Sequence, residues 1–124
     1  MKELTERELN VLEILWDLKS GFVNDVLDKF PDPKPPYTTV SSIIRILESK
    51  GYVSHKAYGK TYEYSPTISR VRYKKNLLKN VISQFFEGSF EKVVSFMASE
   101  NELSEKEANE IAELIEKFKS RQNE

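Results

Sequence analysis

Apolar residues in the first thirty positions recur at the spacing of two helices. Between Leu9 and Leu18 they return every three or four residues, which is typical of a helix that buries one face. Thr5 and Glu8, three residues apart at the edge of this stretch, form a capping box that predicts the helix start. A second apolar set runs from Val23 to Phe30 and predicts a short helix of about two turns. Prolines between positions 31 and 36 end it, because proline removes backbone donors.

The residues after Tyr37 predict a third helix with two unlike faces. Thr38 or Thr39 is expected to cap its start. Gly51 is expected to end it in the left-handed conformation. The apolar stripe of this helix consists of Val40, Ile43, Ile44 and Leu47. The opposite stripe, spaced by four, three and four residues, consists of Thr38, Ser42, Arg45 and Ser49.

Two alternating stretches follow this helix and predict a β-hairpin. Residues 52–58 and 61–64 each alternate polar and apolar side chains, and Gly59-Lys60 between them is a two-residue turn signal. Tyr62 and Tyr64 are expected to lie at least partly in the core. Helix, helix, proline turn, helix and hairpin follow one another in the order of a winged helix.

From Thr67 onward the pattern predicts three helices with a wide apolar face. Gly88 separates the first from the second, and Ser104 and Glu107 form a second capping box before the third. About 55 residues are too few to bury so much apolar surface alone, so a second copy of the chain is the natural cover. The residues expected at this dimer contact are Leu77, Leu78, Val81, Ile82, Phe85, Phe86, Phe90, Val94, Met97, Ile111, Leu114 and Ile115.

Charge is segregated along the chain, although the formal net charge is only −1. Residues 1–33 carry four basic and eight acidic side chains, and residues 80–124 carry five and ten. Residues 34–79 between them carry ten basic and only two acidic side chains. A basic middle between acidic flanks favours a polyanionic partner and aims it at the middle. A solvated face is the alternative interpretation of such a run.

The polar stripe of the third helix is the first candidate for contact with DNA. Exposed helix faces usually carry Lys, Glu and Gln, whereas Ser and Thr are poor helix formers. Their short hydroxyl side chains let a backbone approach bases and phosphates closely, and Arg45 can reach the acceptors of guanine. An ordinary solvated helix face is the competing interpretation. Thr39 and Lys50 complete the candidate set on this helix.

The hairpin supplies further candidates for contact with phosphate. Lys56 and Lys60 flank a tip made by Gly59, which suits a reach toward the DNA backbone. His55 is the only histidine, so we expect a surface or phosphate-contacting residue rather than a metal ligand. Basic residues at the start of the fourth helix, from Arg70 to Lys79, either touch the DNA backbone or keep the linker solvated.

Several classes of function find no support in the composition. The chain has no cysteine, which excludes disulfides, thiolate metal sites and thiol catalysis. No glycine-rich phosphate loop, HExxH motif or paired-carboxylate cleft stands out, so neither an enzyme nor a cofactor is expected. No apolar run approaches the ~18 residues of a membrane span, and the acidic N-terminus does not resemble a signal peptide. We expect a soluble, cytoplasmic protein without membrane insertion.

These patterns predict a mainly α fold with a small β wing. Residues 1–70 would form a winged helix-turn-helix domain that binds double-stranded DNA, and residues 71–124 a helical dimerisation domain. The alternative function is a winged helix used only for protein–protein contact, with the basic segment docked on an acidic partner.

Several segments in order resemble the BlaI/MecI/CopY family of penicillinase repressors. They span nearly the whole chain and consist of residues 4–16, 37–40, 47–53, 62–66, 86–90 and 93–96. The resemblance implies a homodimeric winged-helix repressor on a pseudo-palindromic operator, with the third helix in the major groove. Carried over by position, Thr38, Thr39, Ser42 and Arg45 would face the operator, and Lys56 and Lys60 would serve the wing.

The chain departs from the family pattern in three respects. Where the family often has a basic residue just before the leucine of the third helix, this chain has Ile46, with Arg45 one place earlier. One place is a rotation of about 100° on a helix, which changes the expected base contacts. A sensor-linked protease cleaves antibiotic-responsive relatives at an Asn-Phe bond, and the matching bond here joins Ser95 to Phe96. The paired cysteines of copper-responsive relatives are missing, which excludes copper sensing by that route.

Overall fold

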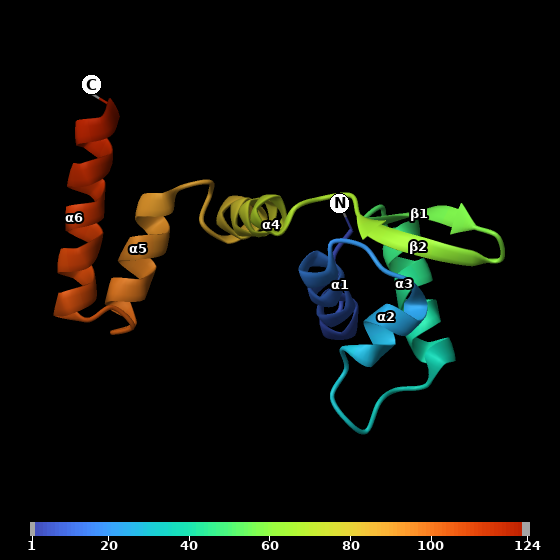
Figure 1. Ribbon diagram of the computed structural model, residues 1–124. Helices are drawn as coiled ribbons and strands as arrows, with labels where there is room; N and C mark the ends of the chain where they lie inside the picture. The colour runs from blue at the N-terminus through green and yellow to red at the C-terminus, as the bar shows by residue number, and fades with distance from the viewer. Residues whose placement is uncertain (1, 123–124) are drawn as a thin grey trace. The chain divides into compact units, whose positions relative to one another are not determined.

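The computed structural model describes residues 2–122, which contain six helices and one two-stranded antiparallel sheet (Figure 1). The chain separates into two compact units, Met1–Lys75 and Asn76–Glu124. In chain order the elements are α1 (Glu6–Leu18), α2 (Val23–Asp28), α3 (Tyr37–Ser49), β1 (Val53–Tyr58), β2 (Thr61–Pro66), α4 (Arg70–Phe85), α5 (Phe90–Ser99) and α6 (Glu105–Gln122). The first unit is a winged helix: three helices followed by a hairpin.

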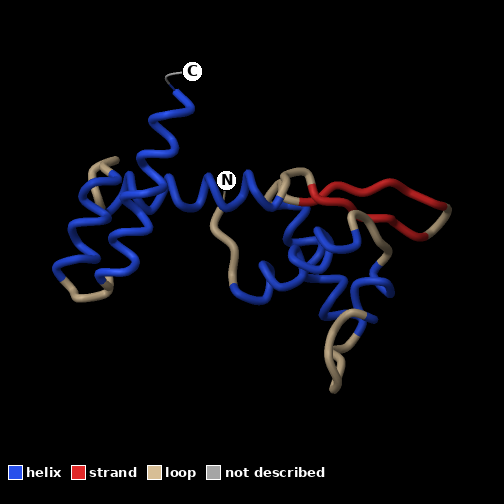
Figure 2. Tube along the Cα trace, turned by 60° about the vertical axis from the view of Figure 1, so that its left-hand side comes forward, coloured by secondary structure: helices blue, strands red, loops and turns tan. Residues whose placement is uncertain are grey.

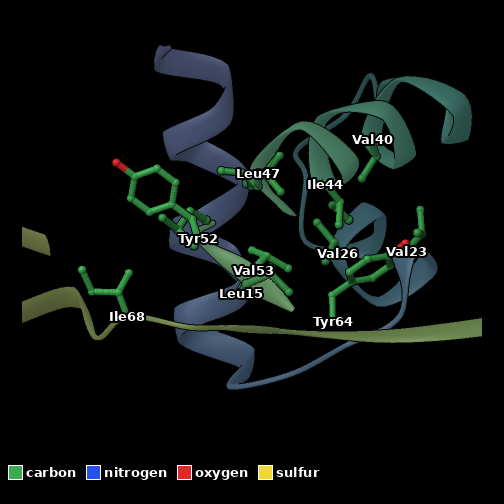
Figure 3. Close-up of a cluster of buried hydrophobic side chains, with 12 residues drawn as sticks. Leu15, Val23, Val26, Val40, Ile44, Leu47, Tyr52, Val53, Tyr64 and Ile68 are labelled. Atoms are coloured by element: carbon green, nitrogen blue, oxygen red, sulfur yellow. The ribbon is translucent and has the colours of Figure 1, made fainter. Parts of the chain in front are cut away.

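One apolar cluster holds the first unit together. Its side chains come from α1, α2, α3 and the base of the hairpin, and they meet in a single core (Figure 3). Because the apolar residues of α1 and α3 recur at helical spacing, each helix turns one whole stripe toward this core. The fully buried side chains are Val11, Leu12, Leu15, Val26, Val40, Ile44 and Leu47.

The start of α1 confirms the predicted capping box. The hydroxyl oxygen of Thr5 accepts a hydrogen bond from the backbone N–H of Glu8, and the Glu8 carboxylate accepts one from the N–H of Thr5 (3.2 Å each). These two bonds satisfy two of the backbone donors that every helix start leaves unpaired.

The predicted cap of α3 is wrong. Neither Thr38 nor Thr39 caps this helix; Pro36 does, with no side-chain hydrogen bond, and the helix begins at Tyr37. The carbonyl of Pro36 accepts hydrogen bonds from the N–H groups of Thr39 and Val40 (3.1 and 3.3 Å). Pro36 has the extended backbone of an N-cap (φ −61°, ψ 149°), so the helix begins two residues earlier than it would with Thr38 as the cap. At the other end Gly51 has a φ of +89°, as predicted.

The hairpin forms as predicted, and only its base is buried. Tyr58 pairs with Thr61 across the two-residue turn, and Gly59 there has a φ of +62°. Tyr64 is buried, and its backbone exchanges two hydrogen bonds with Gly21 (2.8 and 2.9 Å). Tyr62 is 45% exposed, so the expectation that it joins the core is wrong. The helices cover the hairpin only as far as Val53 and Tyr64, and Tyr62 lies beyond that point.

The second unit consists of the rest of α4 with α5 and α6, which two short loops connect (Figure 2). The hydroxyl of Ser89 caps α5, and the predicted pair of Ser104 and Glu107 caps the start of α6. None of the side chains described in α4, α5 or α6 is buried. Within residues 2–122 no helix combines the length and the apolar character that crossing a membrane requires.

Candidate nucleic-acid interface

One face of α3 carries short polar side chains and no packing partner. Thr38, Ser42, Arg45 and Ser49 are all exposed, whereas the opposite stripe is buried in the core. Thr39 lies at the edge of this face and is half-buried. The hydroxyl of Ser49 donates to the carbonyl of Ile46 (2.8 Å), which leaves its oxygen able to accept from outside. We call Thr38, Thr39, Ser42, Arg45 and Ser49 the reading face of α3, and Arg45 lies at its centre.

A groove of about 600 Å³ adjoins the reading face, between α2, α3 and the wing. Arg45 from α3 and Lys60 from the tip of the wing both line it, so two cations from different elements face the same space. Burial raises the pKa of Tyr64 at its base, Glu48 raises it further, and the charge of Arg45 opposes the shift. The groove is lined by Phe22, Val23, Asn24, Asp25, Tyr37, Ser41, Arg45, Lys60, Thr61, Tyr62 and Tyr64.

The wing presents its two lysines on a braced hairpin tip. The Thr61 hydroxyl donates to the carbonyl of Tyr58 (2.9 Å) and closes the turn. The ammonium of Lys56 lies 5.3 Å from the ring centroid of Tyr58, within the range of a cation–π contact. Both Lys56 and Lys60 are exposed, and a phosphate could approach either of them.

His55 joins the wing to α3 through partners on both elements. Its Nδ1 lies 2.5 Å from Oε2 of Glu48, a hydrogen bond in which the imidazole donates. Its ring also stacks on Tyr62, with the centroids 4.3 Å apart. The ring therefore has partners on both α3 and β2. His55 is exposed, as expected, and its contact with phosphate stays a prediction.

Lys50 points back toward α1 and away from the reading face. Its ammonium lies 2.5 Å from Oε1 of Glu8 and donates to the carbonyl of Glu3 (3.0 Å). This hydrogen bond holds the pKa of Glu8 below its ordinary value despite burial, which acts in the opposite direction. The charge of Lys50 therefore already compensates a buried carboxylate, and its contact with DNA stays a prediction.

Arg70 takes a structural role at the start of α4. Its guanidinium bonds the carboxylates of Asp17 (2.9 Å) and Glu13 (3.2 Å) and lies 5.3 Å from the ring centroid of Trp16. The hydrogen bond with Asp17 raises the pKa of Arg70. The indole N–H of Trp16 donates to the carbonyl of Ile68 (2.9 Å), so α1 holds the segment that leads into α4.

The sequence patterns did not single out two residues of α3 that line the groove. Tyr37 and Ser41 precede Arg45 by eight and four residues, so all three line one side of the helix. Spacing alone could have found them. Asn24 could not have been found in this way, because it comes from α2 and meets α3 only in the folded structure.

Most of the residues predicted at the dimer contact are exposed apolar side chains on α4, α5 and α6. Leu77, Leu78, Val81, Phe85, Phe90, Met97, Leu114 and Ile115 are exposed. Ile82, Phe86, Val94 and Ile111 are half-buried. Phe96 is exposed as well, with its ring 5.6 Å from that of Phe86, and Ser95 precedes it inside α5. Among residues 2–122, no three His, Cys, Asp or Glu side chains come together to hold a metal ion.

Comparison with known proteins identifies a family that the chain matches and a solved structure with a similar fold. Residues 4–117 match the model of the penicillinase repressor family. The chain is 24% identical to the penicillinase repressor of Bacillus licheniformis, over 98% of this chain and 96% of that protein. It is also 24% identical to the methicillin resistance regulatory protein MecI of Staphylococcus aureus, over 93% and 94% of the two chains. Among solved structures, hsRosR-S4 has a similar fold, with a TM-score of 0.53 at 19% identity over 81% of this chain and 91% of that one.

Proposed function

The chain belongs to the penicillinase repressor family of DNA-binding transcriptional repressors, and from this premise we propose that it acts as a homodimer that occludes a promoter. Each copy would bind one half of a pseudo-palindromic operator through the reading face of α3. The observation that carries this proposal is the geometry of α3, whose short polar side chains stand opposite an apolar stripe packed on the core and beside a basic wing.

The reading face suits the major groove of DNA. The groove admits one helix, and short Thr and Ser side chains let the helix backbone come close to the base edges. Arg45, at the centre of the face, has the length and the paired donors to contact the O6 and N7 acceptors of guanine. Lys56 and Lys60 would contact phosphates from the wing, which orients the protein on the duplex without reading sequence.

The second unit supports the homodimer. Its exposed apolar side chains include Phe85, which is 69% exposed, and such a surface is unfavourable in water unless another surface covers it. Two copies related by a twofold axis would place their α3 helices in successive major grooves, about 10 base pairs apart.

A mobility-shift assay over a series of salt concentrations tests DNA binding. We expect binding at low salt and a steep loss of affinity as salt rises, because released counterions drive much of the association. Absence of binding at low salt would contradict the proposal. It would favour the alternative of a winged helix that docks an acidic protein partner, which the basic segment also suits.

We further propose that cleavage of the bond between Ser95 and Phe96 ends repression. The bond lies inside α5, so α5 must open locally before a protease can cut it. Cleavage would detach α6 and part of the apolar surface that supports dimerisation. Mass spectrometry of the protein recovered from cells treated with a cell-wall antibiotic should find a fragment ending at Ser95. Derepression with only the intact chain present would contradict this route.

A further inference from the structure

Ile46 is an apolar residue on the polar side of α3. Its side chain is 41% exposed, whereas Val40, Ile44 and Leu47 of the same helix are completely buried. It follows Ser42 by four residues and Thr39 by seven, so it stands beside the hydroxyl groups of the reading face. Ile46 therefore belongs to the surface that α3 offers to a partner.

The fold makes no evident use of the Ile46 side chain. Within residues 2–122 it is neither in the core cluster nor among the half-buried side chains packed against it, although Ile43 is. Only its backbone carbonyl has a role, accepting from the N–H of Lys50 (2.9 Å) and the hydroxyl of Ser49 (2.8 Å). Single exposed apolar side chains are common on proteins, so the position of Ile46 between reading residues is what distinguishes it.

The floor of the major groove displays one apolar group, the 5-methyl group of thymine. An isoleucine on a helix in that groove has this methyl group as its apolar counterpart among the base edges. Arg45, the adjacent residue, suits guanine, so the two side chains together would recognise two kinds of base.

We propose that Ile46 determines specificity by contacting the 5-methyl group of a thymine in each half of the operator. The proposal rests on the proposed function, since it requires α3 to enter the major groove. Burying one methyl group strengthens binding about fourfold. A cytosine at that position would remove the methyl group and leave an amino donor facing an apolar side chain.

The experiment begins with the full-length wild-type chain and a library of random DNA duplexes. The sequence that the protein enriches serves as the operator probe. Each thymine of this probe is then replaced in turn by deoxyuridine, which removes only the 5-methyl group. Affinity is measured by fluorescence anisotropy for the wild type, for Ile46→Ala and for the control Val71→Ala. Val71 is an apolar residue 73% exposed at the start of α4, away from the reading face.

We expect that replacing one particular thymine in each half-site weakens wild-type binding about fourfold. Ile46→Ala should bind the thymine probe more weakly than the wild type does and should be insensitive to that replacement. Val71→Ala should remain as sensitive as the wild type. Thermal melts check folding, which we expect to be unchanged, because alanine favours a helix and Ile46 lies outside the core.

Other results overturn the inference in distinguishable ways. If no replacement affects the wild type, or if Ile46→Ala keeps the full sensitivity, Ile46 does not read a thymine methyl group. If the library yields no enriched sequence, sequence-specific DNA binding itself is wrong, and the proposed function fails together with this inference.

Discussion

The charged side chains of the first unit divide into those with partners in their own chain and those without. Lys50 pairs with Glu8, and Arg70 pairs with Asp17 and Glu13. A cation that already neutralises a carboxylate gains less from a phosphate, because the first bond must be given up. Within residues 2–122 neither Arg45 nor Lys60 forms an ion pair. The structure therefore favours Arg45 and Lys60 as contacts for a polyanion.

Two single substitutions, of Arg45 and of Lys60, should distinguish a contact that recognises the DNA sequence from a contact that binds the DNA backbone. Arg45→Ala should weaken binding to the enriched operator about 5- to 150-fold, because one bidentate contact with guanine is lost, while binding to random DNA changes little. Lys60→Ala should weaken binding to both DNAs alike and lower the salt slope by about one. Fluorescence anisotropy on the two DNAs measures both effects. Equal losses on both DNAs for Arg45→Ala would show that it does not read sequence.

The pair of Glu8 and Lys50 predicts a dependence of stability on pH. The folded pKa of Glu8 lies below its ordinary value of 4.5, so its ionised form stabilises the fold above that pH. This contribution is lost as the pH falls through the lowered pKa. Glu8→Gln should therefore cost about 1–3 kcal/mol of unfolding free energy at neutral pH, and less in acid.

Urea denaturation at pH 7 and in acid measures this difference. Glu6→Gln is the matched control, since Glu6 is exposed in the same turn and should change stability by less than about 0.5 kcal/mol. A deficit for Glu8→Gln that stays constant down to the lowest pH would argue against the ion pair as its cause.

At the scale of elements, α3 has two separate tasks on opposite faces. Its apolar stripe packs against α1 and α2 and holds the helix in place, while its reading face remains available. The wing is attached to this arrangement through Tyr64, which bonds Gly21, and through His55, which bonds Glu48. Rigid support of this kind keeps the reading face in one orientation.

Substitutions on the two faces of α3 should affect different properties. Ile44→Ala should lower the free energy of unfolding by about 2–4 kcal/mol, because it leaves a cavity in the core. Ile46→Ala, two positions away and exposed, should change stability by less than about 0.5 kcal/mol. Urea denaturation of the two variants makes the comparison. Equal losses would mean that the side chain of Ile46 also supports the fold.

At the scale of the whole molecule, the two units differ in how completely they bury their apolar residues. The first unit has a closed core, whereas the helices of the second leave leucines and phenylalanines exposed. Arg70 and Trp16 hold the beginning of α4 to α1, so the helix that carries part of the exposed surface starts from a fixed point.

The proposed homodimer can be tested by changing this surface. The double variant of Leu78→Asp and Phe85→Asp places charges in the apolar face and should convert the dimer into a monomer. Light scattering should give twice the chain mass of 14.4 kDa for the wild type and the chain mass for the variant. Ser83→Asp, at an exposed position on the opposite face of α4, should leave the mass unchanged. A monomeric wild type at micromolar concentration would refute the dimer.

Much of the fold could be predicted from local patterns. The capping box of Thr5 and Glu8, the left-handed Gly51 and the turn at Gly59 each depend on neighbouring residues alone, and the structure confirms all three. The cap of α3 was predicted wrongly, because the fixed backbone of Pro36 competes with a hydroxyl cap. Of the candidate interface, the polar stripe of α3 could be predicted because it follows helical periodicity, while the groove could not.

The order of the elements follows from local patterns alone, and so does the choice of which stripe of α3 enters the core and which stays outside. These follow from spacing of three and four residues or of two, which is a property of neighbouring positions. Which cations remain available to a partner depends instead on contacts between residues far apart in the sequence. Lys50 meets Glu8 across 42 positions and Arg70 meets Asp17 across 53. Such partners are set by the packing of helices, and no local pattern carries that information.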